Sequence, residues 1–208
     1  MPLLAHDFGL TPAQTSLVLS VSTLLLAFAI LFAGLLSESI HRKTLMGVSL
    51  VLSSVLTLAA AVLPGWHGLL ATRALLGVVL GGVPAVAMAY LAEEVHPQGL
   101  GMAMGLYVGG TAFGGMAGRV MTGAVADHFG WRAAIGFTGM LGLLAAMAFL
   151  WLLPPSRRFV PRKGVALADL FDTLGAHLRE PGLRALFAMG FLLMGGFVTI
   201  YNYASFHL

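Results

Sequence analysis

The chain has 208 residues, of which 59% are hydrophobic and only 9% are charged, and its mean hydropathy is +0.94. Soluble domains carry about a quarter charged residues, so this composition excludes an ordinary soluble domain and indicates a protein solvated by lipid. The formal net charge is +3, but the basic residues form no arm, so nucleic acid is not an expected partner. The chain has no cysteine, which excludes disulfides and thiolate metal sites.

The first residues are too polar for a membrane span and lack the pattern of a signal peptide, so the chain is expected to begin in a loop. A span needs about 20 apolar residues, because the hydrocarbon core is about 30 Å thick. Six segments qualify, at residues 14–37, 44–63, 68–92, 101–126, 132–153 and 183–208. Short connections between the first five predict an antiparallel bundle, so the expected fold is an all-α membrane protein with six transmembrane helices.

Lysine and arginine placement orients this bundle, because positive residues are retained on the cytoplasmic side. The first loop carries Arg42 and Lys43, the loop 154–182 and its flanks carry most other basic residues, and the opposite side carries Arg132. We therefore expect the amino terminus to lie outside the cytoplasm. The loop 154–182 also has an apolar stripe at helical spacing, which indicates an amphipathic helix on the membrane surface or an ordinary packed connector.

A glycine and acid pattern occurs at the end of the first span and again at the end of the fourth. Its positions are Gly34, Glu38, His41, Arg42 and Lys43 in the first copy and Gly123, Asp127, Gly130 and Arg132 in the second. The copies lie three spans apart and face opposite sides, as an inverted three-helix repeat predicts. Coincidence remains the alternative, because small residues and an acid are common at helix ends.

The segment from Gly34 to Lys43 resembles the signature loop between the second and third helices of the major facilitator superfamily, G-x-L-a-D-r-x-G-r-k. Glu38, Ser39 and His41 replace the usual aspartate, arginine and glycine. Because histidine tolerates positive φ less readily than glycine, this departure puts the usual tight turn in question. The superfamily's fourth-helix motif, R-x-x-q-G, is matched by Arg73-Ala-Leu-Leu-Gly77, and further matches end at Gly130-Trp131-Arg132.

This resemblance covers essentially every residue and is strongest for bacterial inner-membrane transporters of the efflux branch. It implies that the spans are helices 2 to 7 of a twelve-helix protein, without helix 1 and helices 8 to 12. Residues 1–153 would be the amino-terminal half lacking helix 1, residues 154–182 a cytoplasmic linker, and residues 183–208 helix 7. The expected partners are the lipid bilayer, a small-molecule substrate and protons, with no cofactor.

Ionisable residues within spans are the first candidates for transport and coupling, because charge in hydrocarbon is kept mainly where it faces a cavity or a partner. Arg73 lies about two turns inside the outer end of its span, and the resemblance implies a role in proton coupling. An arginine that snorkels to the outer interface is the alternative. Arg119, late in the fourth span, is a weaker candidate that can also snorkel.

A second candidate set lies at the cytoplasmic ends of the helices. Glu38 could accept hydrogen bonds from the start of a helix in the other half, a contact that in the family helps to hold the outward-facing state. Arg42 could pair with Glu93 or Glu94, or these could be solvated loop charges worth little. The resulting motif loop comprises Gly34, Glu38, Arg42, Lys43, Glu93 and Glu94.

Glycines at four-residue spacing in the fourth span predict close helix contact. They are Gly101, Gly105, Gly109, Gly110, Gly114 and Gly118. Tyr201 and Asn202, inside the last span, could line a substrate path or form hydrogen bonds between helices. The histidines show no i, i+4 pair of a metal-binding helix face, so no metal site is expected.

The leading hypothesis is proton-coupled export of a small solute by the full-length parent through alternating access. One half cannot enclose a midplane site, so this chain alone is expected to be inactive. The alternative is a membrane scaffold or partner subunit that completes a bundle with a complementary carboxy-terminal half. An intramembrane enzyme is not expected, because the spans carry no serine and histidine pair, no paired mid-membrane aspartates and no metal-ligand spacing.

Overall fold

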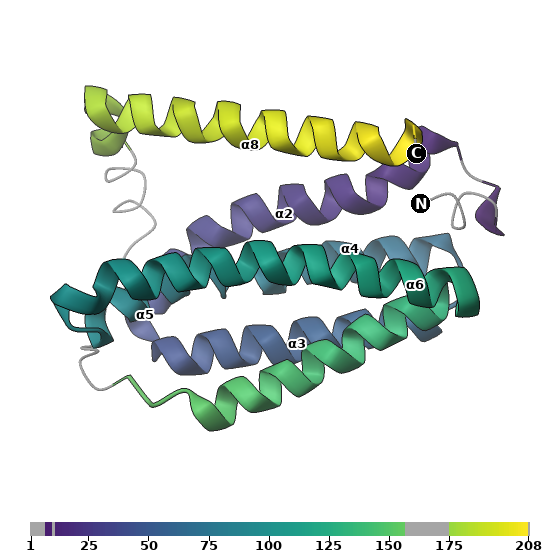
Figure 1. The fold of residues 1–208 in the computed structure, drawn as a ribbon, viewed down its shortest axis with the longest axis horizontal. Helices are drawn as coiled ribbons and strands as arrows, with labels where there is room; N and C mark the ends of the chain where they lie inside the picture. The colour runs from purple at the N-terminus through teal and green to yellow at the C-terminus, as the bar shows by residue number, and fades with distance from the viewer. Residues whose placement is uncertain (1–6, 10, 157–174, 208) are drawn as a thin grey trace. The chain divides into compact units, whose positions relative to one another are not determined.

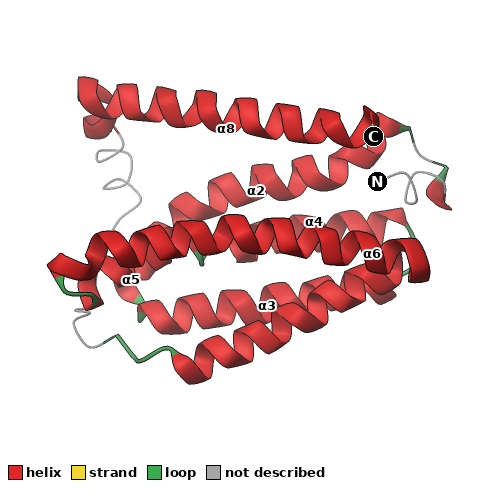
Figure 2. Cartoon of the chain, in the orientation of Figure 1, coloured by secondary structure: helices red, strands yellow, loops and turns green. Residues whose placement is uncertain are grey.

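The computed structural model describes residues 7–9, 11–156 and 175–207, and the regular structure in this part of the chain is helical (Figures 1 and 2). Its helices are α2 (Pro12–Ser39), α3 (Arg42–Val62), α4 (Trp66–Leu80), α5 (Pro84–Glu94), α6 (Pro97–Leu152) and α8 (Pro181–His207). The chain divides into two compact units, Met1–Lys163 and Gly164–Leu208. The expected all-α membrane fold is confirmed.

Four stretches of the described residues are long and apolar enough to cross a membrane. They are Leu17–Ser39, Arg42–Val62, Trp66–Glu94 and Pro97–Leu152. With 56 residues, α6 would be about 84 Å long if straight, far more than one crossing requires. Instead the chain folds back at Gly130, where φ is 81° and ψ is 168° (Figure 1). The two arms of α6 therefore correspond to the predicted fourth and fifth spans.

The turn between α2 and α3 differs from the turn within α6, although both belong to the aligned copies. Gly130 needs a positive φ, whereas His41, the aligned residue, has φ −53° and ψ 127°. Ile40 before it is extended, with φ −113° and ψ 140°. The replacement of glycine by His41 is therefore accommodated by a turn without positive φ, as the departure from the motif predicted.

The predicted third span is interrupted in the structure. α4 ends at Leu80, and α5 begins at Pro84 after a short turn. Proline lacks an amide hydrogen and clashes with the preceding helical turn, which explains the break. Gly82 packs so closely on α3 that a Cβ added there would lie 2.1 Å from Ser49 Oγ. The span predicted over 68–92 is therefore present as the membrane-capable stretch Trp66–Glu94, but it is built from two helices joined by a turn.

Close helix contacts are made by glycines of α4 and of the second arm of α6. On α4, a Cβ at Gly77 would lie 2.3 Å from the carbonyl oxygen of Ser22, and at Gly81, the carboxy-terminal cap of α4, a Cβ would lie 2.7 Å from Ala29 Cβ. On the second arm, contacts with α3 follow an antiparallel order: Leu150 with Gly47, Gly142 with Ser54, Gly139 with Leu58, and Gly136 with Ala61. Small residues thus bring the backbones together.

The predicted contact of the glycine ladder in the first arm of α6 is not made within the described chain. A Cβ added at any of its members would meet no described heavy atom within 4 Å; they are Gly101, Gly105, Gly109, Gly110, Gly114 and Gly118. Phe113 and Met116 on this arm are also exposed. Four-residue spacing identifies a face suited to close contact, but it does not identify the partner, and here the close partners lie on other helices.

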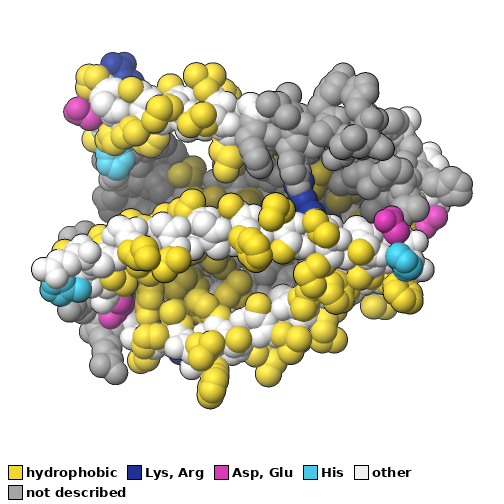
Figure 3. Space-filling model, in the orientation of Figure 1, with side chains coloured by type: hydrophobic (Ala, Val, Ile, Leu, Met, Phe, Trp, Pro, Cys, Tyr) yellow, Lys and Arg dark blue, Asp and Glu magenta, His cyan; other side chains and the backbone are white. Residues whose placement is uncertain are grey.

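The surface of the helices fits a lipid environment. On the face seen in Figure 3, hydrophobic side chains cover the length of α6, and Asp, Glu and His side chains lie near its ends. Residues 157–174, which carry most of the predicted amphipathic linker helix, lie outside the described residues, as do the side chains of Tyr201 and Asn202 in α8. The domain boundaries at 153 and 182 and the roles of these two residues stay predictions.

Candidate transport and coupling site

Arg73 lies where the sequence placed it, seven residues after the start of α4 at Trp66, which is about two helical turns. Its side chain is half-buried, and its Nε atom is buried without a hydrogen-bond partner among the described residues. A buried guanidinium nitrogen without a partner is costly. Arg73 is therefore the best candidate for a group that contacts a substrate, a proton-carrying residue or a further helix.

The backbone around Arg73 is held firmly against α2. Ser22 donates a hydrogen bond from its Oγ to the carbonyl of Arg73 at 2.9 Å, and its own carbonyl faces Gly77 one turn further along α4. Thr72 is buried and donates to the carbonyls of its own helix. The arginine and glycine of the R-x-x-q-G motif thus share one face, and the glycine permits the contact that fixes the arginine's position.

At the other end of these helices a polar cluster joins α2, α3 and α5. The guanidinium of Arg42 makes a bidentate ion pair with Glu93, with Nε 2.6 Å from Oε2 and Nη2 also donating to Oε1. Its Nη1 donates to Ser37 Oγ at 3.0 Å, and Ser37 donates to the carbonyl of Gly34 at 2.6 Å. Of the two carboxylates expected for Arg42, the structure selects Glu93.

The same cluster holds the end of α6. Lys43 Nζ donates to the carbonyl of Leu153, the carboxy-terminal cap of α6. The hydroxyl of Tyr90, a buried residue of α5, donates to the next carbonyl, that of Pro154, at 3.0 Å. We call the set Ser37, Arg42, Lys43, Tyr90 and Glu93 the Arg42 cluster. It connects four helices next to Pro154, where the predicted linker begins.

The Arg42 pair is more sheltered than a surface ion pair. The side chain of Arg42 is 11% exposed and that of Glu93 is 31% exposed. Exposed pairs contribute about 0–1 kcal/mol, but a partly buried bidentate pair contributes more because its hydrogen bonds are charge-assisted. Of the two alternatives left open for Arg42, an ion pair or a solvated charge, the structure shows the ion pair.

The other candidate residues lie on three different helices, and the structure does not bring them together in one site. Glu38 is half-buried in the last turn of α2, and Glu94 is half-buried at the end of α5. Arg119 is exposed on the first arm of α6. Their predicted roles in transport and coupling stay predictions. Among the described residues, no group of His, Asp and Glu side chains is arranged to hold a metal ion.

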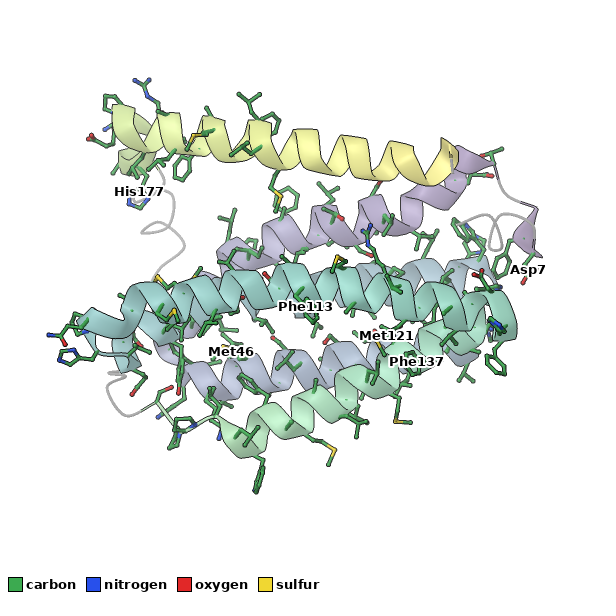
Figure 4. The ribbon with its side chains drawn as sticks, viewed as in Figure 1. Asp7, Met46, Phe113, Met121, Phe137 and His177 are labelled. Atoms are coloured by element: carbon green, nitrogen blue, oxygen red, sulfur yellow. The ribbon has the colours of Figure 1, made fainter. Side chains whose placement is uncertain are left out.

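Several contacts were missed from the sequence. Ser37 and Tyr90 complete the Arg42 cluster, and the only hint was their position near the ends of spans. At the opposite end of the bundle, Trp131 donates from Nε1 to Asp7 Oδ2 at 2.6 Å. Figure 4 shows Asp7 at the end where α6 turns back. Asp7 and Trp131 are 124 residues apart in the chain, a separation that no local pattern bridges.

Comparisons with known proteins agree with this architecture. The family model of the Major Facilitator Superfamily matches residues 1–208. The chain is 46% identical over its whole length to the inner membrane transport protein YnfM of Escherichia coli strain K12, covering 50% of that protein. It is 46% identical over 98% of its length to the uncharacterized MFS-type transporter YybF of Bacillus subtilis strain 168, again covering 50%.

A more distant relative is the niacin transporter NiaP of Acinetobacter baylyi, 30% identical over 67% of the chain and covering 32% of that protein. The chain spans about half the length of the two more similar relatives. Its helices, its motifs around Arg42 and Arg73, and these matches lead to one conclusion: the chain is a multi-pass membrane protein that belongs to the major facilitator superfamily of transporters.

Proposed function

We propose that this chain forms the amino-terminal bundle of a longer bacterial inner-membrane transporter that exports a small organic solute in exchange for protons. The amino terminus of the chain would lie on the outer side, and the Arg42 cluster in the cytoplasm. The relatives of about twice its length support the larger assembly, and the printed name of the niacin transporter supports a small organic molecule as substrate.

The observation that carries this proposal is the burial of Arg73 within a membrane span. Ionisable groups inside a membrane span are functional by default, because only a cavity or a partner compensates their burial. The Nε of Arg73 is buried without a described hydrogen-bond partner, while its backbone is fixed on α2. This combination fits a cation whose partner changes during transport, such as a substrate group or a protonatable carboxylate.

The Arg42 cluster supports the alternating-access part of the proposal. Rocking of one bundle against another requires each bundle to move as a unit. The bidentate pair of Arg42 with Glu93 and the bonds from Lys43 and Tyr90 join the helix ends at one side of the bundle. Glu38 lies half-buried in the last turn of α2, at the same end of the bundle as the Arg42 cluster.

The test is transport in liposomes that contain the full-length protein encoded with this chain, compared with the 208-residue chain alone. We expect solute movement driven by a pH gradient in the full-length protein and none in the chain alone. Arg73→Gln should abolish coupling to the gradient, and Arg73→Lys should retain part of it because the charge remains. Arg119→Gln is tested beside it, because Arg119 is the second candidate for the coupling role, and Arg179→Gln is the control because Arg179 is an exposed arginine outside the candidate set.

Gradient-driven transport by the 208-residue chain alone would overturn the proposal that it is one half of the transporter. Full coupling in Arg73→Gln together with loss in Arg119→Gln would move the coupling role to Arg119. If the unmodified protein transports solute at a rate that does not depend on the pH gradient, coupling to protons is excluded and only solute transport is supported.

A further inference from the structure

α3 and the second arm of α6 cap each other at both ends. Lys43, near the start of α3, donates to the carbonyl of Leu153 at the carboxy-terminal cap of α6. Arg132, near the start of the second arm, donates from Nη1 to the carbonyls of Ala61 and Leu63, each at 3.2 Å, and Leu63 is the carboxy-terminal cap of α3. A cation at these carbonyls satisfies unpaired acceptors and opposes the negative end of the helix dipole.

These reciprocal contacts are made by residues at aligned positions of the sequence repeat. The alignment that places Gly34 on Gly123 also places Lys43 on Arg132, so aligned residues make equivalent contacts at opposite ends of the bundle. The alignment places Arg42 on Trp131. The aligned positions therefore agree in their contacts as well as in their sequence, which supports the repeat.

Trp131 makes the contact that the repeat predicts for the position of Arg42. Arg42 donates to the carboxylate of Glu93, and Trp131 donates from Nε1 to the carboxylate of Asp7 at 2.6 Å. Each acid comes from a segment outside the α3 and α6 pair. Glu93 lies at the end of α5, and Asp7 lies in the segment that precedes α2.

Aromatic packing supports the contact of Asp7 with Trp131. The ring of Phe8 lies 5.7 Å from that of Trp131 and 6.3 Å from that of Trp66. The guanidinium of Arg132 lies 4.6 Å from the centre of the Trp131 ring, at the distance of a cation–π contact. Trp131 itself is only 9% exposed, so its indole nitrogen is desolvated and depends on the carboxylate of Asp7.

We propose that Asp7 and Trp131 are a positioning pair for transport, the outer counterpart of Glu93 and Arg42. The pair holds the segment before α2 on the α3 and α6 unit, as the Arg42 pair holds α5. Each end of the bundle then has a pair in which a side-chain donor binds a carboxylate from another segment, and we call the pair of Asp7 and Trp131 the lock. The role in transport rests on the proposed function, whereas the lock itself is a property of the chain.

The lock is tested by hydrogen–deuterium exchange on the purified chain, with peptides from residues 7–20, 126–135 and 42–50. Asp7→Leu and Trp131→Phe should each raise amide exchange about tenfold in the first two peptides, the size expected for loss of a hydrogen bond to a charged group. Exchange in the third peptide should stay unchanged. Asp7→Asn, which keeps an acceptor oxygen, should show a smaller effect, and the double variant should exceed neither single one.

The matched control is Asp127→Asn, since Asp127 is an exposed acid near the same turn. Unchanged exchange at residues 7–20 in Asp7→Leu, or effects of Asp7→Leu and Trp131→Phe that add in the double variant, would overturn the lock. A rise in all three peptides would also overturn it, because it would show general destabilisation.

The positioning role is tested in the full-length protein by transport kinetics. Trp131→Phe should lower the maximal rate about tenfold and leave the KM within about twofold, because the pair lies at the end of the bundle and away from Arg73. Faster amide exchange with unchanged transport kinetics would show that the pair is only a packing contact and would overturn the positioning role. A protein that transports nothing would contradict the proposed function, while the exchange result would still decide the lock.

Discussion

At the residue scale, the bidentate pair of Arg42 with Glu93 joins two helices through two charge-assisted hydrogen bonds. Both groups are partly buried, and Ser37 accepts a third bond from the guanidinium. Removing one partner leaves the other charge partly desolvated, so the loss exceeds that of a surface pair. This pair is the one site contact that the sequence motif anticipated by residue number.

We predict that Glu93→Gln and Arg42→Gln each lower the free energy of unfolding by about 1–3 kcal/mol. The double variant should lose little more than either single variant, because both remove the same interaction. Reversible unfolding in mixed detergent micelles measures these values, with Asp127→Asn as the exposed control. Additive losses would show that the two residues do not act as a pair.

At the element scale, the glycines that matter are those at helix contacts. Gly77→Ala would place a Cβ 2.3 Å from the carbonyl oxygen of Ser22, a backbone atom that cannot easily move. We expect a loss of about 1–3 kcal/mol in unfolding free energy. Gly109→Ala is the matched control, because a Cβ there meets no described atom within 4 Å, and alanine is the better helix former. Equal losses for the two variants would contradict this assignment.

The turn within α6 gives a second prediction at this scale. Gly130 has φ 81° and ψ 168°, a region that is essentially restricted to glycine. Gly130→Ala should therefore destabilise the chain by about 1–3 kcal/mol. Gly123→Ala is the control, since Gly123 lies within the helical first arm without close neighbours among the described atoms. An unchanged free energy of unfolding in Gly130→Ala would contradict a turn that needs a positive φ at this residue.

The sequence predicted the spans to within a few residues, as for α2 and α3, because hydropathy and polar interruptions fix where a helix leaves the membrane. It missed the break between α4 and α5, since hydropathy continues through Gly81-Gly82-Val83-Pro84, although this stretch itself is a helix-breaking signal. The glycine ladder of the first arm meets no close neighbour among the described residues, because spacing alone does not identify a partner helix. The contact of Asp7 with Trp131 needed the fold.

At the scale of the whole molecule, an inverted repeat places the Arg42 and Trp131 ends of this bundle on opposite sides of the membrane. Ser39 and His128 occupy equivalent positions of the two copies, five residues after Gly34 and Gly123, and both are exposed. The natural chain has no cysteine, so single cysteines can be introduced without a background of native thiols.

The most direct measurement is labelling of Ser39→Cys and His128→Cys with a membrane-impermeant maleimide, with the unmodified chain as the unlabelled control. We expect His128→Cys to be labelled in intact cells and Ser39→Cys to be labelled only after permeabilisation. Labelling of both cysteines from the same side would contradict the inverted repeat and the orientation that follows from it.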